Sequence, residues 1–293
     1  MTAPVESTNT FGDSLTAAFD STGHLCVGID PHSFLLGTWG LEDSAGGARE
    51  FGLRVVEAAH GTAGIIKPQV AFFERFGSAG FAALEDVLRA GRDAGLIVIG
   101  DAKRGDVGST VEAYASAWLT AGSPLEVDAM TISAFQGLGS LDDAHRLAAA
   151  NGAGLFVLAA TSNPESVDPQ TAVLSSGPHA GSSISGAIVA GVVEWNALEI
   201  ERTGSALGSV GVVLGATVNL DLYDIDRESL TSTPILAPGF GYQGAEYADI
   251  PRIFGAAASS VLVSASRSIL AAGPSGIAEA IQLHSSLIAE VYA

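Results

Sequence analysis

Short, nearly continuous apolar runs recur along the chain, and stretches with helical periodicity separate them. Apolar residues that follow one another without alternation are typical of strands covered on both faces, as in a parallel sheet. The pattern predicts eight such strands, at residues 25–30, 64–68, 96–103, 129–133, 155–160, 210–215, 234–239 and 261–264.

The stretches between these runs are amphipathic. In residues 81–90, for example, Phe81, Leu84, Val87 and Leu88 fall on one helical face. Eight strand–helix units in a chain of 293 residues predict a TIM (β/α)8 barrel that forms a single domain over residues 1–293. A doubly wound open sheet is the alternative. The segment 161–185, rich in Ser, Gly and Pro, is then a long insertion after the fifth strand.

The charge balance limits the partners of the protein. Thirteen basic residues stand against 32 acidic ones, a net charge of -19. Such a chain repels nucleic acid and anionic membranes, which bind clustered Lys and Arg. A local cationic pocket can still bind a small anion, because salt screens distant charges within about 8 Å.

Several features predict a cytoplasmic, soluble protein. Cys26 is the single cysteine, so an internal disulfide is excluded and a reducing compartment fits. The first ten residues lack the basic start and apolar core of a signal peptide. The longest apolar stretch, residues 186–193, is far too short to span a bilayer.

The chain has only two lysines, Lys67 and Lys103, and each lies at the end of a predicted strand. In a TIM barrel the carboxyl ends of the strands form the active site. Residues two apart on a strand project to the same side, so Asp101 and Lys103 should enter the barrel mouth together, with Arg104 pointing away. Consecutive strands are neighbours, which places Lys67 beside Asp101.

We therefore expect an alternating array of Lys67, Asp101, Lys103 and, in the following loop, Asp106. Opposite charges at short range favour both charged forms. Lys103 should then remain an ammonium, which is a good proton donor and a poor Schiff-base nucleophile. The alternative is a purely structural network of ion pairs at the barrel rim.

A second group of residues indicates a phosphate site. TIM barrels often bind phosphate through the loops after strands seven and eight. Here the glycine-rich run 239–244 carries Gln243, and the eighth loop supplies Arg267 beside backbone N–H groups near Ser266. The alternatives are an ordinary flexible loop and a surface arginine.

No dedicated metal site is expected, because the six histidines show no metal-ligand spacing and form no cluster with cysteine. The sequence also contains no Gly-x-Ser-x-Gly nucleophile elbow and no Walker lysine.

In combination these elements resemble the orotidine 5'-phosphate decarboxylase family, most closely its longer bacterial branch, over residues 25–270. The Asp-x-Lys-x-x-Asp element alone is shared with related barrels, and it is the ordered set that is specific. The elements are Gly28-Ile-Asp-Pro31, Lys67-Pro68, Asp101-Ala-Lys-Arg-Gly-Asp106 with Thr110, Pro238-Gly-Phe-Gly-Tyr-Gln-Gly244 and Arg267.

The resemblance implies decarboxylation of orotidine 5'-phosphate to UMP in pyrimidine synthesis, by a TIM-barrel homodimer with no metal or organic cofactor. It implies that Lys103 protonates C6 of the pyrimidine and that Asp101 lies against the substrate carboxylate. Lys67 would order Asp101 and touch the ribose, while Asp30 would bind a ribose hydroxyl.

The remaining implied roles concern the phosphate, the pocket wall and the partner subunit. Gln243 and Arg267 would hold the phosphate, Pro238 would wall the pocket, and Asp106 and Thr110 would reach the partner's site. One element departs from the branch, which usually has an Asn-Pro-Tyr-Leu-Gly-like turn after strand four. Ser133 stands there in this chain and is expected at the pyrimidine edge.

Three other functions use similar residues. A magnesium-dependent sugar-phosphate decarboxylase or synthase shares the Asp-x-Lys-x-x-Asp strand, and a Schiff-base aldolase would use Lys103 as nucleophile. A non-catalytic barrel would bind the nucleotide without converting it.

Overall fold

The structure is a computed structural model that describes residues 9–242 and 244–293. Within these residues, eight parallel strands pair in chain order and close into a barrel when β8 pairs with β1. The prediction of a TIM barrel is confirmed. The strands are β1 (Leu25–Ile29), β2 (Ile65–Pro68), β3 (Ile97–Arg104), β4 (Ala129–Ser133), β5 (Gly154–Ala160), β6 (Val210–Leu214), β7 (Ile235–Pro238) and β8 (Val261–Ala265).

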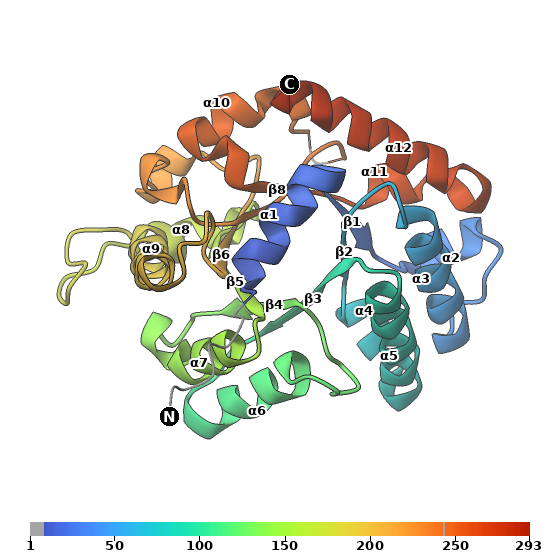
Figure 1. Cartoon of the computed structure of the whole chain (residues 1–293), viewed down its shortest axis with the longest axis horizontal. Helices are drawn as coiled ribbons and strands as arrows, with labels where there is room; N and C mark the ends of the chain where they lie inside the picture. Colours follow the sequence, from blue (N-terminus) through green and yellow to red (C-terminus); the bar gives the residue numbers. More distant parts are fainter. Residues whose placement is uncertain (1–8, 243) are drawn as a thin grey trace, which may run out of the picture.

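Helices surround this barrel, and α1 crosses one end of it, as Figure 1 shows. The helices are α1 (Phe11–Thr22), α2 (Ser33–Thr38), α3 (Ala45–Ala59), α4 (Ala71–Glu74), α5 (Gly77–Asp93), α6 (Gly108–Leu119), α7 (Asp142–Ala150), α8 (Val167–Thr171), α9 (Ile184–Thr203), α10 (Ile250–Phe254), α11 (Arg267–Leu270) and α12 (Gly273–Tyr292). Short 3-10 turns are η1 (Leu138–Leu141), η2 (Pro164–Ser166), η3 (Leu220–Tyr223), η4 (Glu228–Leu230), η5 (Tyr247–Asp249) and η6 (Gly255–Ser260).

The eight predicted strands are the eight observed strands, with ends that agree closely. The agreement has a simple cause: side chains on both faces of each strand are buried, so the apolar run marks the strand directly. The predicted amphipathic helix lies within α5, where Leu84, Val87 and Leu88 are buried and Phe81 packs against the core.

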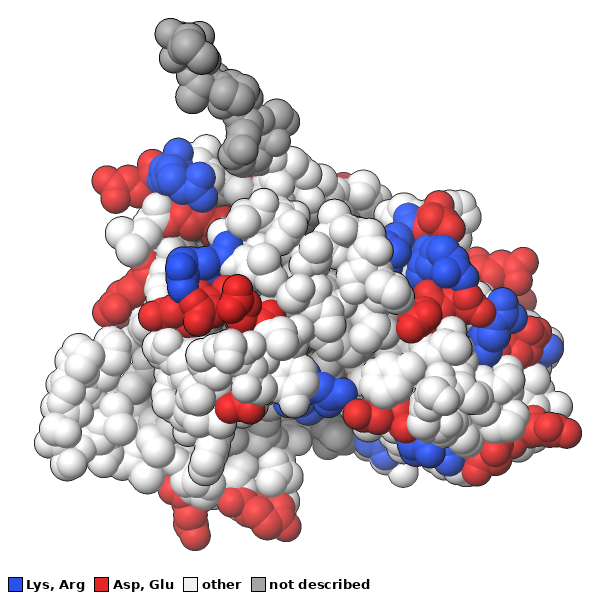
Figure 2. All heavy atoms as spheres, turned by 90° about the horizontal axis from the view of Figure 1, so that it is seen from below, with Lys and Arg blue, Asp and Glu red and all other residues white. Residues whose placement is uncertain are grey.

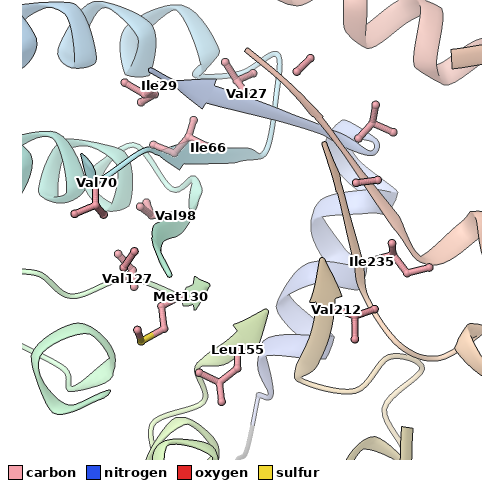
Figure 3. Packing of buried hydrophobic residues seen from close by; sticks show 14 of the residues in the cluster. Val27, Ile29, Ile66, Val70, Val98, Val127, Met130, Leu155, Val212 and Ile235 are labelled. Atoms are coloured by element: carbon pink, nitrogen blue, oxygen red, sulfur yellow. The ribbon is translucent and has the colours of Figure 1, made fainter. Parts of the chain in front are cut away.

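The hydrophobic core has two layers, because alternate strand residues face opposite sides of the sheet. The larger layer lies between the strands and the surrounding helices, and Figure 3 shows part of it. Its labelled members are Val27, Ile29, Ile66, Val70, Val98, Val127, Met130, Leu155, Val212 and Ile235.

The second layer fills the barrel interior at one end only. Helix α1 lies across this end (Figure 1) and inserts Phe11 and Leu15 among the strand residues. The Phe11 ring meets Phe156 edge to face, with centroids 5.9 Å apart. A capping box between Thr10 and Asp13 fixes the start of α1. Since α1 precedes β1, it closes the amino-terminal end of the barrel and leaves the carboxyl end open.

The segment 161–185 after β5 is largely structured. It contains η2 and α8, and then a turn that returns antiparallel, where Val173 pairs with Ser183. Gln170 holds the base of this segment, because its amide accepts from Thr161 N and donates to Thr161 Oγ1. The beginning of the insertion, residues 161–163, is thereby fixed at the barrel mouth.

Charged side chains are gathered in small groups on the surface. Figure 2 shows basic side chains beside acidic ones, with broad uncharged areas between them. Exposed ion pairs of this kind each contribute at most about 1 kcal/mol. In the part of the chain that the structure describes, no helix has the length and apolarity needed to cross a bilayer.

Candidate active site

A cavity of about 310 Å³ opens at the carboxyl ends of the barrel strands. Its floor is apolar, with Leu158, Val213 and Leu236, and its walls are polar. This size is at the lower end of the range of about 300–1,000 Å³ typical of small-molecule sites. The polar wall residues are Asp30, Lys67, Gln69, Asp101, Lys103, Thr131, Thr161, Ser162, Asn163, Tyr242, Ser264, Ser266 and Arg267.

Both lysines of the chain form ion pairs with the same carboxylate, that of Asp101, in this cavity. Lys67 Nζ lies 2.9 Å from Asp101 Oδ2, and Lys103 Nζ lies 2.5 Å from Asp101 Oδ1. The Lys67 and Asp101 side chains are 7% and 8% exposed, whereas that of Lys103 is 45% exposed towards the cavity. The predicted contacts of Lys67, Asp101 and Lys103 are thus present, and Lys103 offers the more accessible ammonium.

The charges of the buried pair are mutually stabilised. Burial opposes ionisation of Asp101, but the Lys67 and Lys103 charges and the hydrogen bonds they donate outweigh it and hold the pKa of Asp101 well below its usual range. Burial likewise disfavours the Lys67 ammonium, but Asp101 and Asp30 outweigh it and raise the pKa of Lys67. The low pKa of Asp101 stabilises the folded protein at neutral pH, and this contribution is lost as acid protonates the carboxylate.

The backbone at Lys103 departs from the regular strand that the sequence suggested. Its φ of 47° lies in the left-handed region, which costs a residue other than glycine about 1–2 kcal/mol. The register between β3 and β4 also shifts, since Gly100 pairs with Met130 but Arg104 pairs with Ile132. The expected two-residue alternation therefore does not bring Asp101 and Lys103 together. A bulge in β3 brings Asp101 and Lys103 together instead. It also turns Arg104 outward, where its guanidinium lies 3.0 Å from the Glu74 carboxylate.

Two polar residues complete the surroundings of Asp101, and neither was expected from the sequence. The Gln69 amide, turned to satisfy both neighbours, donates to Asp101 Oδ2 and accepts from Lys103 Nζ at 3.2 Å. Thr131 Oγ1 donates to Asp101 Oδ1 at 2.8 Å. A carboxylate has about four acceptor positions, and here Lys67, Lys103, Gln69 and Thr131 fill them.

The expected phosphate end lies across the cavity. Arg267 lines it and stacks on the Tyr242 ring, with the guanidinium carbon 3.8 Å from the ring centroid. Among the described residues Arg267 has no acidic partner, so its donors remain available to an anion. Gly239, Gly241 and Gly244 take positive φ values in the adjoining loop. Gln243 lies outside the described residues.

The expected ribose and wall residues also line the cavity. Within the part of the chain that the structure describes, Asp30 Oδ1 is buried and accepts no hydrogen bond, an arrangement that suits a ligand hydroxyl. Pro238 ends β7 and also lines the cavity.

Ser133, expected at the pyrimidine edge, is not among the residues that line the cavity. It lies at the end of β4 against the loop that follows β3, where a Cβ built at Gly105 would meet the Ser133 carbonyl oxygen at 2.4 Å. Polar groups at that part of the cavity come from the start of the insertion instead, at Thr161, Ser162 and Asn163. Sequence reasoning did not identify these residues as site residues, because the Ser/Gly/Pro composition of the segment is typical of an ordinary loop.

Asp106 and Thr110 lie at the rim and do not line the cavity of the single chain. Asp106 Oδ1 accepts from Val107 N at 2.8 Å, and Thr110 is exposed on α6. Across the described ranges, no group of three or more His, Cys, Asp or Glu side chains is arranged to hold a metal ion.

Fold and site together define a class: a TIM barrel with a buried Lys–Asp–Lys ion-pair cluster at the carboxyl ends of its strands. The chain belongs to the orotidine 5'-phosphate decarboxylase / HUMPS family, whose family model matches residues 23–281. Named relatives are the orotidine 5'-phosphate decarboxylases of Streptomyces coelicolor, 48% identical over 90% of this chain and 91% of that protein, and of Salinispora arenicola, 47% identical over 90% and 91%.

Solved structures agree with this assignment. A crystal structure of a protein from Streptomyces avermitilis aligns with this chain over the full length of both chains, with 44% sequence identity and a TM-score of 0.90. The OMP decarboxylase of Leishmania donovani is 30% identical, with a TM-score of 0.75 over 97% of this chain and all of that one.

Proposed function

We propose that the protein removes carbon dioxide from orotidine 5'-phosphate to give UMP, a step of pyrimidine synthesis, without a metal or organic cofactor. The observation that carries the proposal is the contact series from Lys67 through Asp101 to Lys103 in the barrel mouth. Named relatives with this activity, 47–48% identical over 90% of the chain, support the choice of substrate.

The chemistry requires a positive charge beside one carbon atom. When the bond from C6 to the carboxylate breaks, its electron pair stays on C6 and carbon dioxide leaves. The Lys103 ammonium stabilises this negative charge because its position is already fixed by Asp101 at 2.5 Å. It then gives its proton to C6, which completes UMP, and recovers a proton from solvent.

Asp101 has two roles in this scheme. It keeps both lysines close together, and it stands against the substrate carboxylate, so departure of carbon dioxide relieves a repulsion between two anions. We attribute the rate acceleration mainly to the Lys103 ammonium, because the four hydrogen-bond donors around Asp101 already disperse the negative charge of its carboxylate.

The substrate lies with its phosphate at Arg267 and its base over Lys103. Asp30 and Lys67 bind the ribose, Pro238 walls the base, and Gln243 is the expected second phosphate ligand. We assign the polar edge of the pyrimidine to Ser162 and Asn163, because they line the cavity and Ser133 does not.

The active enzyme is proposed to be a homodimer in which Asp106 and Thr110 complete the partner's site. The rim beside them carries exposed apolar side chains that a second subunit would cover: Val107 at 52%, Tyr114 at 36% and Phe135 at 92% exposure. The loops after β3 and β4 lie together here, as the contact of Gly105 with Ser133 indicates.

An ultraviolet assay tests the function. The purified chain, made in a host that lacks its own orotidine 5'-phosphate decarboxylase, is expected to consume orotidine 5'-phosphate at the same rate with and without EDTA. Loss of activity in EDTA would favour a metal-dependent relative. Binding of UMP without turnover would favour a non-catalytic barrel.

Arg267→Ala tests the phosphate end. Loss of a bidentate, charge-assisted contact is expected to raise KM by about 10²–10³-fold with a smaller change in kcat. Arg252→Ala is the matched control, because Arg252 is 73% exposed and pairs with Asp249 away from the cavity. Steady-state kinetics decide the point: an unchanged KM for Arg267→Ala would contradict the phosphate role.

A further inference from the structure

Thr131 stands alone opposite the bulge that carries the acid–base centre. Gly100 pairs with Met130 and Arg104 pairs with Ile132, so residues 101–103 of β3 face the single residue Thr131 of β4. The Thr131 side chain is 1% exposed and lines the cavity.

Its hydroxyl makes two hydrogen bonds, one to each functional residue of the bulge. Lys103 N donates to Thr131 Oγ1 at 2.9 Å, and Thr131 Oγ1 donates to Asp101 Oδ1 at 2.8 Å. These roles are fixed by chemistry, since an amide can only donate and an ionised carboxylate can only accept. The hydroxyl has a single O–H group, and it donates that hydrogen bond to the Asp101 carboxylate.

The first of these bonds supports an unfavourable backbone. Lys103 has a φ of 47°, and outside glycine such a conformation persists when surrounding contacts hold it. The bulge removes Lys103 N from the regular ladder between β3 and β4, and Thr131 Oγ1 is its acceptor.

The second bond restrains the carboxylate. Asp101 Oδ1 receives both Lys103 Nζ at 2.5 Å and Thr131 Oγ1 at 2.8 Å. The Thr131 hydroxyl therefore donates to the same Asp101 oxygen that accepts from the Lys103 ammonium. It also accepts a hydrogen bond from the backbone N–H of Lys103. Threonine is stiff about χ1, so the hydroxyl itself has a defined direction.

We propose that Thr131 is a positioning residue that fixes the Lys103 ammonium for proton transfer by bonding both the Lys103 backbone and Asp101. This rests on the proposed decarboxylation. Valine has nearly the shape of threonine and suits a strand, but it has no hydroxyl, so Thr131→Val removes both hydrogen bonds with little change in side-chain volume. The paired bonds give the hydroxyl its purpose.

Thr131→Val is the decisive variant. It is expected to lower kcat by about 30-fold, since small misplacement of a catalytic group has effects up to about 10²-fold. The Kd for UMP should change by less than about 3-fold, because the ribose and phosphate contacts are untouched. Thr131→Ser keeps the hydroxyl and should restore kcat to within about 5-fold of the native value.

Thr233→Val is the matched control. Thr233 is also 1% exposed and its hydroxyl accepts from Asn196 at 3.0 Å, but it precedes β7 at the far end of the barrel. Its kcat should stay within about 2-fold of native even where its melting temperature falls. Thr131→Ala removes the same hydroxyl and replaces Thr131→Val if that variant does not fold.

A folded Thr131→Val or Thr131→Ala enzyme with native kcat would overturn the proposal, as would a Thr131→Ser enzyme no better than Thr131→Val. If the native chain fails to consume orotidine 5'-phosphate, the proposed function falls, and crystal structures decide the positioning role separately. Displacement of Lys103 Nζ from Asp101 in Thr131→Val supports it, and an unmoved Lys103 overturns it.

Discussion

Replacing Lys103 with alanine is expected to lower kcat by about 10⁵-fold while leaving the affinity for UMP nearly unchanged. Two effects are lost together. General acid catalysis contributes about 10²–10⁴-fold, and a fixed positive charge at the developing anion contributes about 10²–10³-fold. A loss of about 10⁵-fold corresponds to about 7 kcal/mol of transition-state stabilisation.

The variant should fold normally. Alanine and lysine meet the same backbone restriction at a φ of 47°, so no new strain is added. Asp101 keeps its contacts with Lys67 at 2.9 Å and Thr131 at 2.8 Å, and is therefore not left as an isolated buried charge. In the proposed binding mode the ribose and phosphate contacts come from other residues, which is why UMP should still bind.

Arg104→Ala is the control for this prediction. It removes the adjacent positive charge, but the guanidinium points to Glu74 at 3.0 Å on the outside of the barrel. Its kcat is expected to stay within about 3-fold of native. A Lys103→Ala enzyme that keeps a near-native rate would refute the assignment. Borohydride trapping of substrate on Lys103 would indicate Schiff-base chemistry instead.

The fold could be predicted because one physical rule operates along the whole chain. Strands covered on both faces are apolar throughout, so runs such as 261–264 and 210–215 identify themselves. Chain order then fixed the neighbours, since consecutive units are adjacent in this barrel. The same adjacency correctly brought Lys67 to Asp101 across β2 and β3.

The local geometry of β3 could not be predicted in the same way. The positive φ of Lys103 occurs within the bulge, and the backbone N–H of Lys103 donates to the hydroxyl of Thr131, which is 28 residues away along the chain. The alternation rule led to the right contact between Asp101 and Lys103 for the wrong reason, because the strand is not regular there.

Thr131 and Gln69 were missed because their sequence context is ambiguous. Threonine is a common strand residue, so a single threonine between Met130 and Ile132 attracts no notice. The one available indication was polarity within an otherwise apolar run, close to a strand end. Ser133 lies at the predicted strand end but is not among the residues that line the cavity, so its place at the pyrimidine edge stays a prediction.

The acidic surface and the cationic site are compatible. A net charge of -19 repels anions at long range, but the cavity places Lys67, Lys103 and Arg267 within one small volume. Inside it the interaction is screened less than in solvent, so short-range attraction exceeds the distant repulsion. The substrate carries a phosphate and a carboxylate, which suits two cationic ends of one pocket.

Mixing two inactive variants, Lys103→Ala and Asp106→Ala, is expected to restore activity. The Lys103→Ala homodimer has no proton donor, and the Asp106→Ala homodimer lacks the acid proposed to enter from the partner. In a heterodimer, one site takes Lys103 from one subunit and Asp106 from the other. Random reassembly gives about half heterodimers with one intact site of two, so about a quarter of native activity should return.

The control mixture is Lys103→Ala with Asp101→Asn. These two residues touch within one chain, with Lys103 Nζ 2.5 Å from Asp101 Oδ1, so every heterodimer has a defect in each of its sites. This mixture should stay inactive after the same reassembly. Heterodimers isolated with two affinity tags and assayed directly give the clearest measurement. If verified Lys103→Ala/Asp106→Ala heterodimers are no more active than the control, Asp106 serves its own subunit and the shared site is wrong.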